Sequence, residues 1–225
     1  MTEETTKGQG PIEVRMFTVG MVQENCYLVR RQDATAAIVI DPGDEPAKLL
    51  GAIDTLGLEI AAILITHTHF DHIGAVTPLA RATGAEVWCP ELELPVLADI
   101  MSYVPWPGFG PFESYQADHS VSGGEALELA GFDIDVLFTP GHSPGHVSYS
   151  IASEQALFSG DVLFQGSVGR TDLPGGDGPK LLESIGRLVR DLPGETTVYP
   201  GHMGITTLAA ERATNPFLTE LAADR

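Results

Sequence analysis

The sequence is poor in basic residues and in long apolar runs, and each shortage excludes a class of protein. Only 12 lysines and arginines stand against 31 aspartates and glutamates, which gives a formal net charge of −19. Such a surface repels phosphate backbones, so we expect no nucleic-acid partner. No apolar run approaches the ~20 residues that span a bilayer, and the polar start, 1–7, resembles no signal peptide. We therefore expect a cytoplasmic protein with no membrane partner.

Cysteine is also scarce. Cys26 and Cys89 stand in unrelated contexts without C-x-x-C spacing, and we expect buried free thiols, not a disulfide or a metal-binding pair. The remaining composition, with 43% hydrophobic residues, 25 glycines and 16 prolines, is typical of an ordered, turn-rich globular chain. We expect one domain over residues 1–225, in which residues 1–11 are flexible.

Hydrophobic periodicity and turn residues predict an α/β protein. Strands are predicted at 12–19, 26–30, 36–40, 61–65, 85–89, 125–129, 132–138, 147–151, 156–159 and 196–199. Helices are predicted at 46–56, 78–84, 90–99, 179–189, 206–212 and 216–221. Gln23–Asn25 is expected to be the first turn, and Thr77 to cap the second helix. Two strand-rich halves with helices indicate two layered sheets covered by helices.

The most informative stretch is Thr66-His67-Thr68-His69-Phe70-Asp71-His72, which directly follows the apolar run 61–65. The chain has seven histidines, and three of them lie within these seven residues. Imidazole and carboxylate are common ligands of zinc, and also of iron and manganese. The stretch therefore predicts a metal-binding loop at the end of a buried strand.

Further candidate ligands stand at equivalent places. His142, Asp161 and His202 each follow a glycine just past the end of a predicted strand. A single histidine in such a place is more often structural than a ligand, but three such positions together with the first loop favour a metal site.

These residues resemble the metallo-β-lactamase fold superfamily. The resemblance rests on the H-x-H-x-D-H pattern at 67–72, followed in order by His142, Asp161 and His202, and it covers the chain from about residue 12. It implies an αββα four-layer sandwich that holds two divalent ions, zinc in the first place and iron or manganese as alternatives. It also implies the assignment of ligands: one ion on His67, His69 and His142, the other on Asp71, His72 and His202, and a bridge at Asp161.

Two features resemble the short, single-domain glyoxalase II-like hydrolases. The zinc β-lactamases proper typically carry Cys where this chain has Asp161, and the segments 169–177 and 211–216 resemble the glyoxalase II-like group. The resemblance implies hydrolysis of a thioester of a small thiol by a metal-bridging hydroxide, which Asp71 could orient. Full-length glyoxalase II has a C-terminal helical region that recognises glutathione, whereas only residues 203–225 follow His202 here, so the resemblance leaves the identity of the thiol carrier open.

Other functions are compatible with the same pattern. Gly169–Asp172 also resembles the persulfide dioxygenases, which would imply one iron on His67, His142 and Asp161. A lactonase would use the same ions, and a fold relative with a dead site would act as a binding module. Leu173–Asp177 favours the hydrolase.

Several residues near the expected site have two interpretations. Arg170 and Asp172 could contact the substrate or pair with each other, and Tyr103 and Trp106 could line a pocket. The aromatic-rich segment 101–118 could form a lid or pack on the core. Asp41 could support a metal ligand or form a turn. His146 could support a metal ligand or make a structural hydrogen bond. His119 is expected in a loop.

Overall fold

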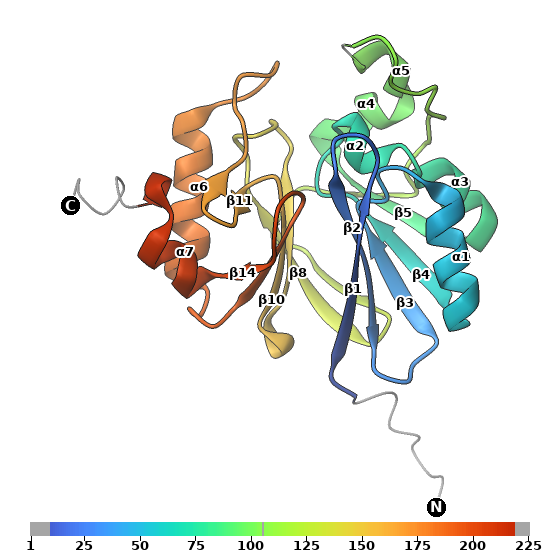
Figure 1. Ribbon diagram of the computed structural model, residues 1–225, viewed down its shortest axis with the longest axis horizontal. Helices are drawn as coiled ribbons and strands as arrows, with labels where there is room; N and C mark the ends of the chain where they lie inside the picture. Colours follow the sequence, from blue (N-terminus) through green and yellow to red (C-terminus); the bar gives the residue numbers. More distant parts are fainter. Residues whose placement is uncertain (1–9, 105, 219–225) are drawn as a thin grey trace, which may run out of the picture.

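Two six-stranded sheets pack face to face, and helices cover both outer faces (Figure 1). The computed structural model describes residues 10–104 and 106–218. Most of the stretch expected to be flexible (1–9) and the end of the helix expected at 216–221 lie outside these residues. The layering confirms the predicted αββα sandwich.

The first sheet has, in spatial order, β1 (Ile12–Val19), β2 (Glu24–Arg31), β3 (Ala36–Ile40), β4 (Glu59–Leu64), β5 (Glu86–Pro90) and β6 (His119–Val121). The second has β14 (Thr206–Thr207), β13 (Thr197–Pro200), β10 (Ala156–Gly160), β9 (Val147–Ile151), β8 (Phe132–Phe138) and β7 (Ala126–Leu129). β11 (Leu163–Phe164) and β12 (Ser167–Val168) form a separate hairpin. Strands β3 to β6 run parallel, as do β10 and β13.

The helices are α1 (Pro46–Leu56), α2 (Phe70–Ile73), α3 (Val76–Thr83), α4 (Leu94–Ala98), α5 (Ile100–Tyr103), α6 (Gly178–Asp191) and α7 (Leu208–Thr214). Short 3₁₀ turns lie at Glu91–Glu93 and Ala152–Glu154. In Figure 1, α1 and α3 lie outside the first sheet, α6 and α7 lie outside the second, and α2, α4 and α5 gather at the upper edge.

Three apolar layers hold the sandwich together. Between the sheets, Ile38 and Leu64 of the first pack in one cluster with Phe132 and Phe158 of the second. A second cluster joins the first sheet to α1 and α3, and a third joins the second sheet to α6 and α7. Burying apolar surface at ~25 cal/mol per Å² is the main force that keeps four layers in register. The strand ends that carry the site therefore stand on a rigid support.

Local sequence signals explain the clearest helices. Asp177 caps α6, because its side chain accepts a hydrogen bond from the backbone N–H of Lys180 at 3.0 Å. Gly57 ends α1 at φ +62°, a left-handed conformation that glycine adopts without a steric penalty. Both boundaries agree with the predictions within two residues.

Three local predictions are wrong. The helix α3 starts at Val76, so Thr77 lies inside it, and its hydroxyl donates to the backbone oxygens of Glu113 and Ser114. The first turn is 20–23, whereas Glu24 already belongs to β2. His119 begins β6, where its ring stacks on a tryptophan of β5 at 4.0 Å.

Two predictions from composition can be compared with the structure. Cys26 and Cys89 are buried free thiols, as expected. Among the described residues, no helix has the length and apolar character that a membrane crossing requires.

Candidate metal centre

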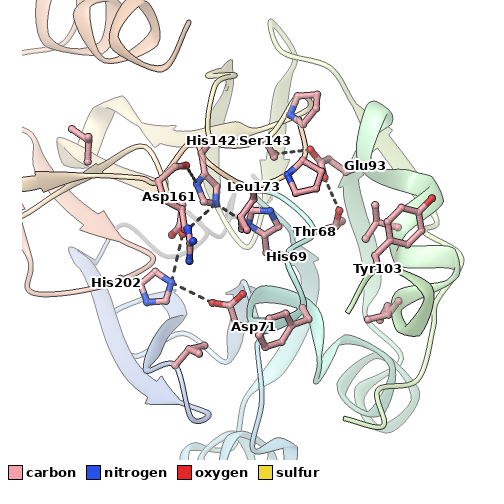
Figure 2. A pocket seen from close by; sticks show the side chains of 18 of the residues that line it. Thr68, His69, Asp71, Glu93, Tyr103, His142, Ser143, Asp161, Leu173 and His202 are labelled. Carbon is pink, nitrogen blue, oxygen red and sulfur yellow. Dashed lines mark hydrogen bonds and ion pairs between the residues drawn. The ribbon is translucent and has the colours of Figure 1, made fainter. Parts of the chain in front are cut away.

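The seven predicted ligands converge at one edge of the sandwich. His67, His69, Asp71 and His72 follow β4, while His142, Asp161 and His202 follow β8, β10 and β13. Parallel pairing of β10 with β13 brings the last two together, since Gly160 lies opposite Pro200. Packing of the two sheets then brings the loop after β4 close to the loops of the second sheet. Figure 2 shows side chains from both sheets directed toward one another: His69, Asp71, His142, Asp161 and His202.

The first group consists of three imidazoles. Nε2 of His142 lies 2.8 Å from Nδ1 of His69 and 3.2 Å from Nε2 of His67. Nε2 of His67 lies 3.1 Å from Nδ1 of His69. Ligand atoms on a tetrahedral zinc, at ~2.0–2.1 Å from the metal, stand roughly 3.3 Å apart. The triangle therefore has nearly the size that one ion requires.

The second group joins Asp71, His72 and His202, whose ligand atoms lie within 4.8 Å of one another. Nε2 of His202 lies 3.3 Å from Oδ2 of Asp71, and Nε2 of His72 lies 3.9 Å from the same oxygen. Asp161 stands between the two groups, with Oδ1 3.4 Å from His72 and Oδ2 3.4 Å from His142. Oδ2 also lies 3.5 Å from Nε2 of His202, so the carboxylate reaches members of both groups, which is the placement of a bridging ligand.

Hydrogen bonds at the far side of each ring fix which nitrogen faces the centre. Nδ1–H of His142 donates to the backbone oxygen of Arg170 at 2.7 Å, and Nδ1–H of His202 donates to the backbone oxygen of Gln23 at 3.3 Å. Nδ1–H of His72 donates to Asp41 at 3.0 Å. A neutral imidazole with Nδ1 protonated keeps its lone pair on Nε2. These three rings therefore offer a free lone pair to the centre.

The tautomer of His67 follows from its neighbour Thr66. The Thr66 hydroxyl donates its one hydrogen to Oδ2 of Asp41 at 2.6 Å, so its oxygen accepts from Nδ1–H of His67 at 3.1 Å. Asp41 therefore orients two ligands, His72 directly and His67 through Thr66. Partners of this kind raise ligand basicity and hold ring orientation in metal sites. The structure places Asp41 in the supporting role that the sequence left open.

His146 supports Asp161. Its Nε2 accepts the backbone N–H of Asp161 at 3.1 Å, and its Nδ1 lies 3.0 Å from the hydroxyl of Thr139. Burial lowers the pKa of His146 well below its ordinary value, which keeps the ring neutral and able to accept. His146 is therefore a structural neighbour of the ligands that holds one of them in place.

The centre has the electrostatic character of a cation site. Oδ1 of Asp161 and Nε2 of His72 are buried and have no hydrogen-bond partner among the described residues. Unpaired buried polar atoms cost roughly 1–3 kcal/mol each, and a divalent ion between them removes that cost. The donor set of imidazole and carboxylate is the one that zinc, iron and manganese take. The residues therefore fit the ions that the fold family implies.

The directions of the pKa shifts agree with a cation site. Burial, supported by the neighbouring histidines, lowers the pKa of His67 well below its ordinary value and that of His69 to about 4, so both are neutral and ready to bind. Burial alone would lower the pKa of His72, but the carboxylates of Asp161 and Asp71 raise this pKa well above the ordinary value of histidine. The two carboxylates thus favour positive charge at this point, which a metal ion would supply.

Glycine at two positions lets the backbone lie close to the ligand side chains. A Cβ on Gly201 would overlap Oδ1 of Asp161 and stand 2.7 Å from Cε1 of His72. Gly160 has φ +50°, and a Cβ there would stand 2.6 Å from Nε2 of His146. These close approaches explain why a glycine precedes each of Asp161 and His202.

Glu93 links the two ligand-bearing loops. The carboxylate is buried and accepts hydrogen bonds from the hydroxyls of Thr68 and Ser143, both at 2.6 Å, and from the backbone N–H of Gly145 at 2.9 Å. Thr68 lies between His67 and His69, and Ser143 follows His142. Glu93 could not be predicted from the sequence, because nothing in the Glu-Leu-Glu stretch at 91–93 distinguishes a buried glutamate from an exposed one.

A cavity of about 640 Å³ opens beside the ligands and reaches between the segment 92–106 and the segment 164–174. His69, Asp71, His142, Asp161 and His202 form its floor. Most other lining residues are apolar: Val22, Phe70, Leu92, Val96, Ile100, Tyr103, Trp106, Pro144, Phe164, Val168, Leu173, Pro174 and Met203. In Figure 2, Tyr103 lies across the cavity from the histidines.

The segment 101–118 contributes to the cavity wall and also packs against the metal loop. Tyr103 and Trp106 line the cavity. Phe109 and Phe112 instead pack on Phe70, with ring centroids 4.7 and 5.9 Å away. Phe70 lies between two candidate ligands, so the aromatic segment supports the metal loop as well as the cavity wall.

Arg170 and Asp172 pair with each other. Nε and Nη2 of Arg170 donate to the two oxygens of Asp172 at 2.6 and 2.8 Å, and both side chains are largely exposed. Arg170 borders the cavity, whereas Asp172 lies outside its lining. Arg170 contacts the centre through its backbone oxygen, which accepts the hydrogen bond from Nδ1–H of His142.

The late segment 211–216 is structural. Glu211 is buried and accepts hydrogen bonds from the N–H of Gly166 at 2.8 Å and from the side chain of Asn215 at 2.8 Å. The same Asn215 amide donates to the backbone oxygen of Ser167 at 3.0 Å. The segment thus holds the β11–β12 hairpin, which forms one wall of the cavity.

Comparisons with known proteins agree with the fold. The family model described as "Metallo-beta-lactamase superfamily" matches residues 19–202. A protein named hydroxyacylglutathione hydrolase GloC, from Haemophilus influenzae, is 35% identical over 92% of this chain and 98% of its own length. A protein named probable metallo-hydrolase YqgX, from Bacillus subtilis, is 40% identical over 91% of this chain and 96% of its own length.

Solved structures are similar over the same range. The B3 metallo-β-lactamase BLEG-1 superposes with a TM-score of 0.87 at 40% identity, over 92% of this chain and 100% of that one. TTHA1623 in a di-iron-bound form has a TM-score of 0.80 at 45% identity, over 91% and 100%. ETHE1 from Myxococcus xanthus has a TM-score of 0.73 at 28% identity, over 91% and 83%.

Proposed function

The chain belongs to the metallo-β-lactamase superfamily, and we propose that it is a metal-dependent hydrolase that cleaves a thioester of a small thiol. The observation that carries this proposal is the completeness of two adjoining ligand groups on the floor of one cavity. His67, His69 and His142 would hold one ion, Asp71, His72 and His202 a second, and Asp161 would bridge them. The hydrolase names of two relatives support the reaction type.

When bound, the pair of divalent ions supplies a nucleophile at neutral pH by lowering the pKa of water, and it polarises the carbonyl group under attack. We propose zinc first and iron or manganese as alternatives, since imidazole and carboxylate suit all three. A relative of known structure carries two irons, which supports two ions as the number.

The protein's own groups would position and orient the reactants. Asp71 borders the cavity, and its carboxylate can accept a hydrogen from the attacking water, which would fix the direction of the water's lone pair. Asp41 and Thr66 hold the histidine rings while charge develops. Glu93 holds the two loops at a fixed separation, which is the positioning effect that catalysis requires.

The lining favours a substrate with a good leaving group. Hydrolysis forms a C–O bond to the carbonyl carbon and breaks the C–S bond, and the thiolate takes up the proton. Among the lining residues that are not candidate ligands, Glu93 has the one carboxyl group, and both its oxygens already accept hydrogen bonds. A thiolate leaves with little help from an acid because a free thiol has a pKa of about 8.5. A thioester therefore suits this site better than an amide.

A persulfide dioxygenase is the second candidate, and the similarity to ETHE1 is the observation that favours it. One iron on His67, His142 and Asp161 would leave the second group without a role. The close approach of Asp71, His72 and His202 supports the hydrolase over this alternative.

The two buried free cysteines support a reducing compartment, and we propose the cytoplasm as the location of the protein.

The test is an assay of metal-loaded protein on S-lactoylglutathione, on S-acyl-N-acetylcysteamine thioesters and on a chromogenic cephalosporin, with oxygen uptake on glutathione persulfide measured in parallel. We expect thioester turnover that His69→Ala lowers at least 100-fold, and no oxygen uptake. Thioester turnover that survives His69→Ala, or oxygen uptake as the main activity, would overturn the proposal.

A further inference from the structure

The cavity beside the ligands has an apolar mouth as well as an apolar interior. Five large apolar side chains line it and are still exposed to solvent: Val22 (40%), Leu92 (63%), Tyr103 (54%), Trp106 (42%) and Met203 (56%). Solvated apolar groups that gather around a concave site mark a surface that an apolar ligand covers.

These side chains come from two parts of the molecule. Val22 belongs to the turn between β1 and β2, and Met203 follows the candidate ligand His202. Leu92, Tyr103 and Trp106 belong to the segment that follows β5, and Tyr103 lies across the cavity from His202 (Figure 2). An extended apolar chain that leaves the centre would contact both sides at once, whereas a compact polar group would leave them in water.

The mouth offers little to a charged group. Among the described residues that line the cavity, Arg170 is the only arginine or lysine, and its guanidinium already makes two hydrogen bonds to Asp172. Glu93 is the one carboxylate in the lining that is not a candidate ligand, and the whole chain carries −19. A carrier with several carboxylates or phosphates would therefore meet one partly engaged arginine at the mouth, and the acidic chain as a whole would repel it at a distance.

We infer that the acyl group of the substrate is an uncharged, medium-length apolar chain that fills the cavity, and that the thiol carrier is small and carries no net negative charge. The inference rests on the proposed thioester hydrolysis and names its substrate class. Each methylene that moves from water into the cavity contributes about 0.8 kcal/mol, which corresponds to roughly fourfold in kcat/KM.

The experiment uses metal-loaded protein and the acetyl, butyryl, hexanoyl and octanoyl thioesters of N-acetylcysteamine, with S-lactoylglutathione for comparison. We expect kcat/KM to rise roughly fourfold per methylene until the cavity is full, and S-lactoylglutathione to be a poorer substrate than the hexanoyl ester. Trp106→Ala and Leu92→Ser should each lower the octanoyl-to-acetyl ratio of kcat/KM by about fivefold to twentyfold. Met16→Ala is the matched control, since Met16 is 41% exposed but lies on β1, outside the cavity lining, and should leave the ratio unchanged.

A binding measurement separates chain recognition from turnover. The S-octyl thioether of N-acetylcysteamine, which cannot be hydrolysed, should bind more tightly than the S-ethyl thioether by at least tenfold, with a negative heat-capacity change. Equal kcat/KM for all chain lengths, or S-lactoylglutathione as the best substrate, would overturn the inference while the proposed function stands. Absence of turnover on every thioester would overturn both.

Discussion

Asp41 accepts a hydrogen bond from Nδ1 of His72 at 3.0 Å, and the same carboxylate accepts two from Thr66, whose hydroxyl in turn accepts from His67. Asp41 directly follows β3, and Thr66 stands shortly after the neighbouring parallel strand β4. One carboxylate at the end of one strand therefore orients a ligand from each of the two proposed metal groups.

Asp41→Asn should weaken metal binding about 10-fold to 100-fold, because an amide cannot accept all three of these hydrogen bonds. Asn tolerates the left-handed backbone of this position (φ +48°), so the fold should be kept. The measurement is competitive zinc titration against a chromophoric chelator. Asp33→Asn is the control, because Asp33 is exposed and has a similar backbone (φ +62°). Equal affinity of the two variants would show that Asp41 does not support the metal ligands.

Gly201→Ala should disturb both metal groups, since its Cβ would overlap Asp161 and press on His72. We expect loss of at least one bound ion and a decrease in kcat/KM of more than 100-fold. Gly51→Ala is the matched control: a Cβ at this helical position meets nothing within 4 Å, and alanine should stabilise α1 by about 0.5–1 kcal/mol. A Gly201→Ala variant with full metal content and activity would contradict the described packing.

Glu93→Ala should lower kcat about 10-fold to 100-fold while metal content stays near that of the parent protein, because Glu93 separates and orients the loops without facing the ions. Glu93→Gln keeps the shape and one acceptor, so it should restore most of the activity. Glu91→Ala tests the same substitution on an exposed residue of the same turn, and it should have no effect. If Glu93→Ala and Glu93→Gln had the same kcat, the hydrogen bonds of Glu93 to the two loops would not be the cause of the lower kcat.

Removal of the metal should destabilise the fold. A ligand present at 1,000 times its Kd adds about 4 kcal/mol to the free energy of unfolding, which for a chain of this size corresponds to roughly 10 °C in Tm. Zinc returned to chelator-treated protein should therefore raise the Tm by about this amount. Calcium, which prefers sites made of oxygen ligands, serves as the control and should not. An identical rise with calcium would mean that the imidazoles do not form the site.

The sequence predicted those parts of the site that depend on local pattern. The candidate ligands at 67–72 lie next to one another in the chain, and His142, Asp161 and His202 stand behind glycines at strand ends. The strands could therefore be identified, together with seven side chains that the structure brings to one place. The four-layer arrangement was implied by resemblance and agrees with the comparisons.

The supporting contacts could not be predicted, because they join residues far apart in the chain. Glu93 meets Ser143 across 50 positions, and His202 meets Gln23 across 179. Such pairs depend on how the 3₁₀ turn at Glu91–Glu93 and the turn 20–23 pack against the second sheet, and hydrophobic periodicity does not encode this packing. The prediction of Thr77 as a helix cap was wrong for a related reason. Its hydroxyl bonds to the backbone of 113–114, a segment whose position is fixed only by tertiary packing.

We propose that seven side chains form one centre for two ions. The metal content per chain of the purified protein and of His202→Ala, measured by elemental analysis after removal of loosely bound metal, tests this proposal. We expect two divalent ions per chain in the parent protein and one in His202→Ala, since His202 contacts Asp71 and the bridging Asp161 but no histidine of the first group. One ion per chain in both proteins would contradict the two-ion centre and would favour the single-iron alternative.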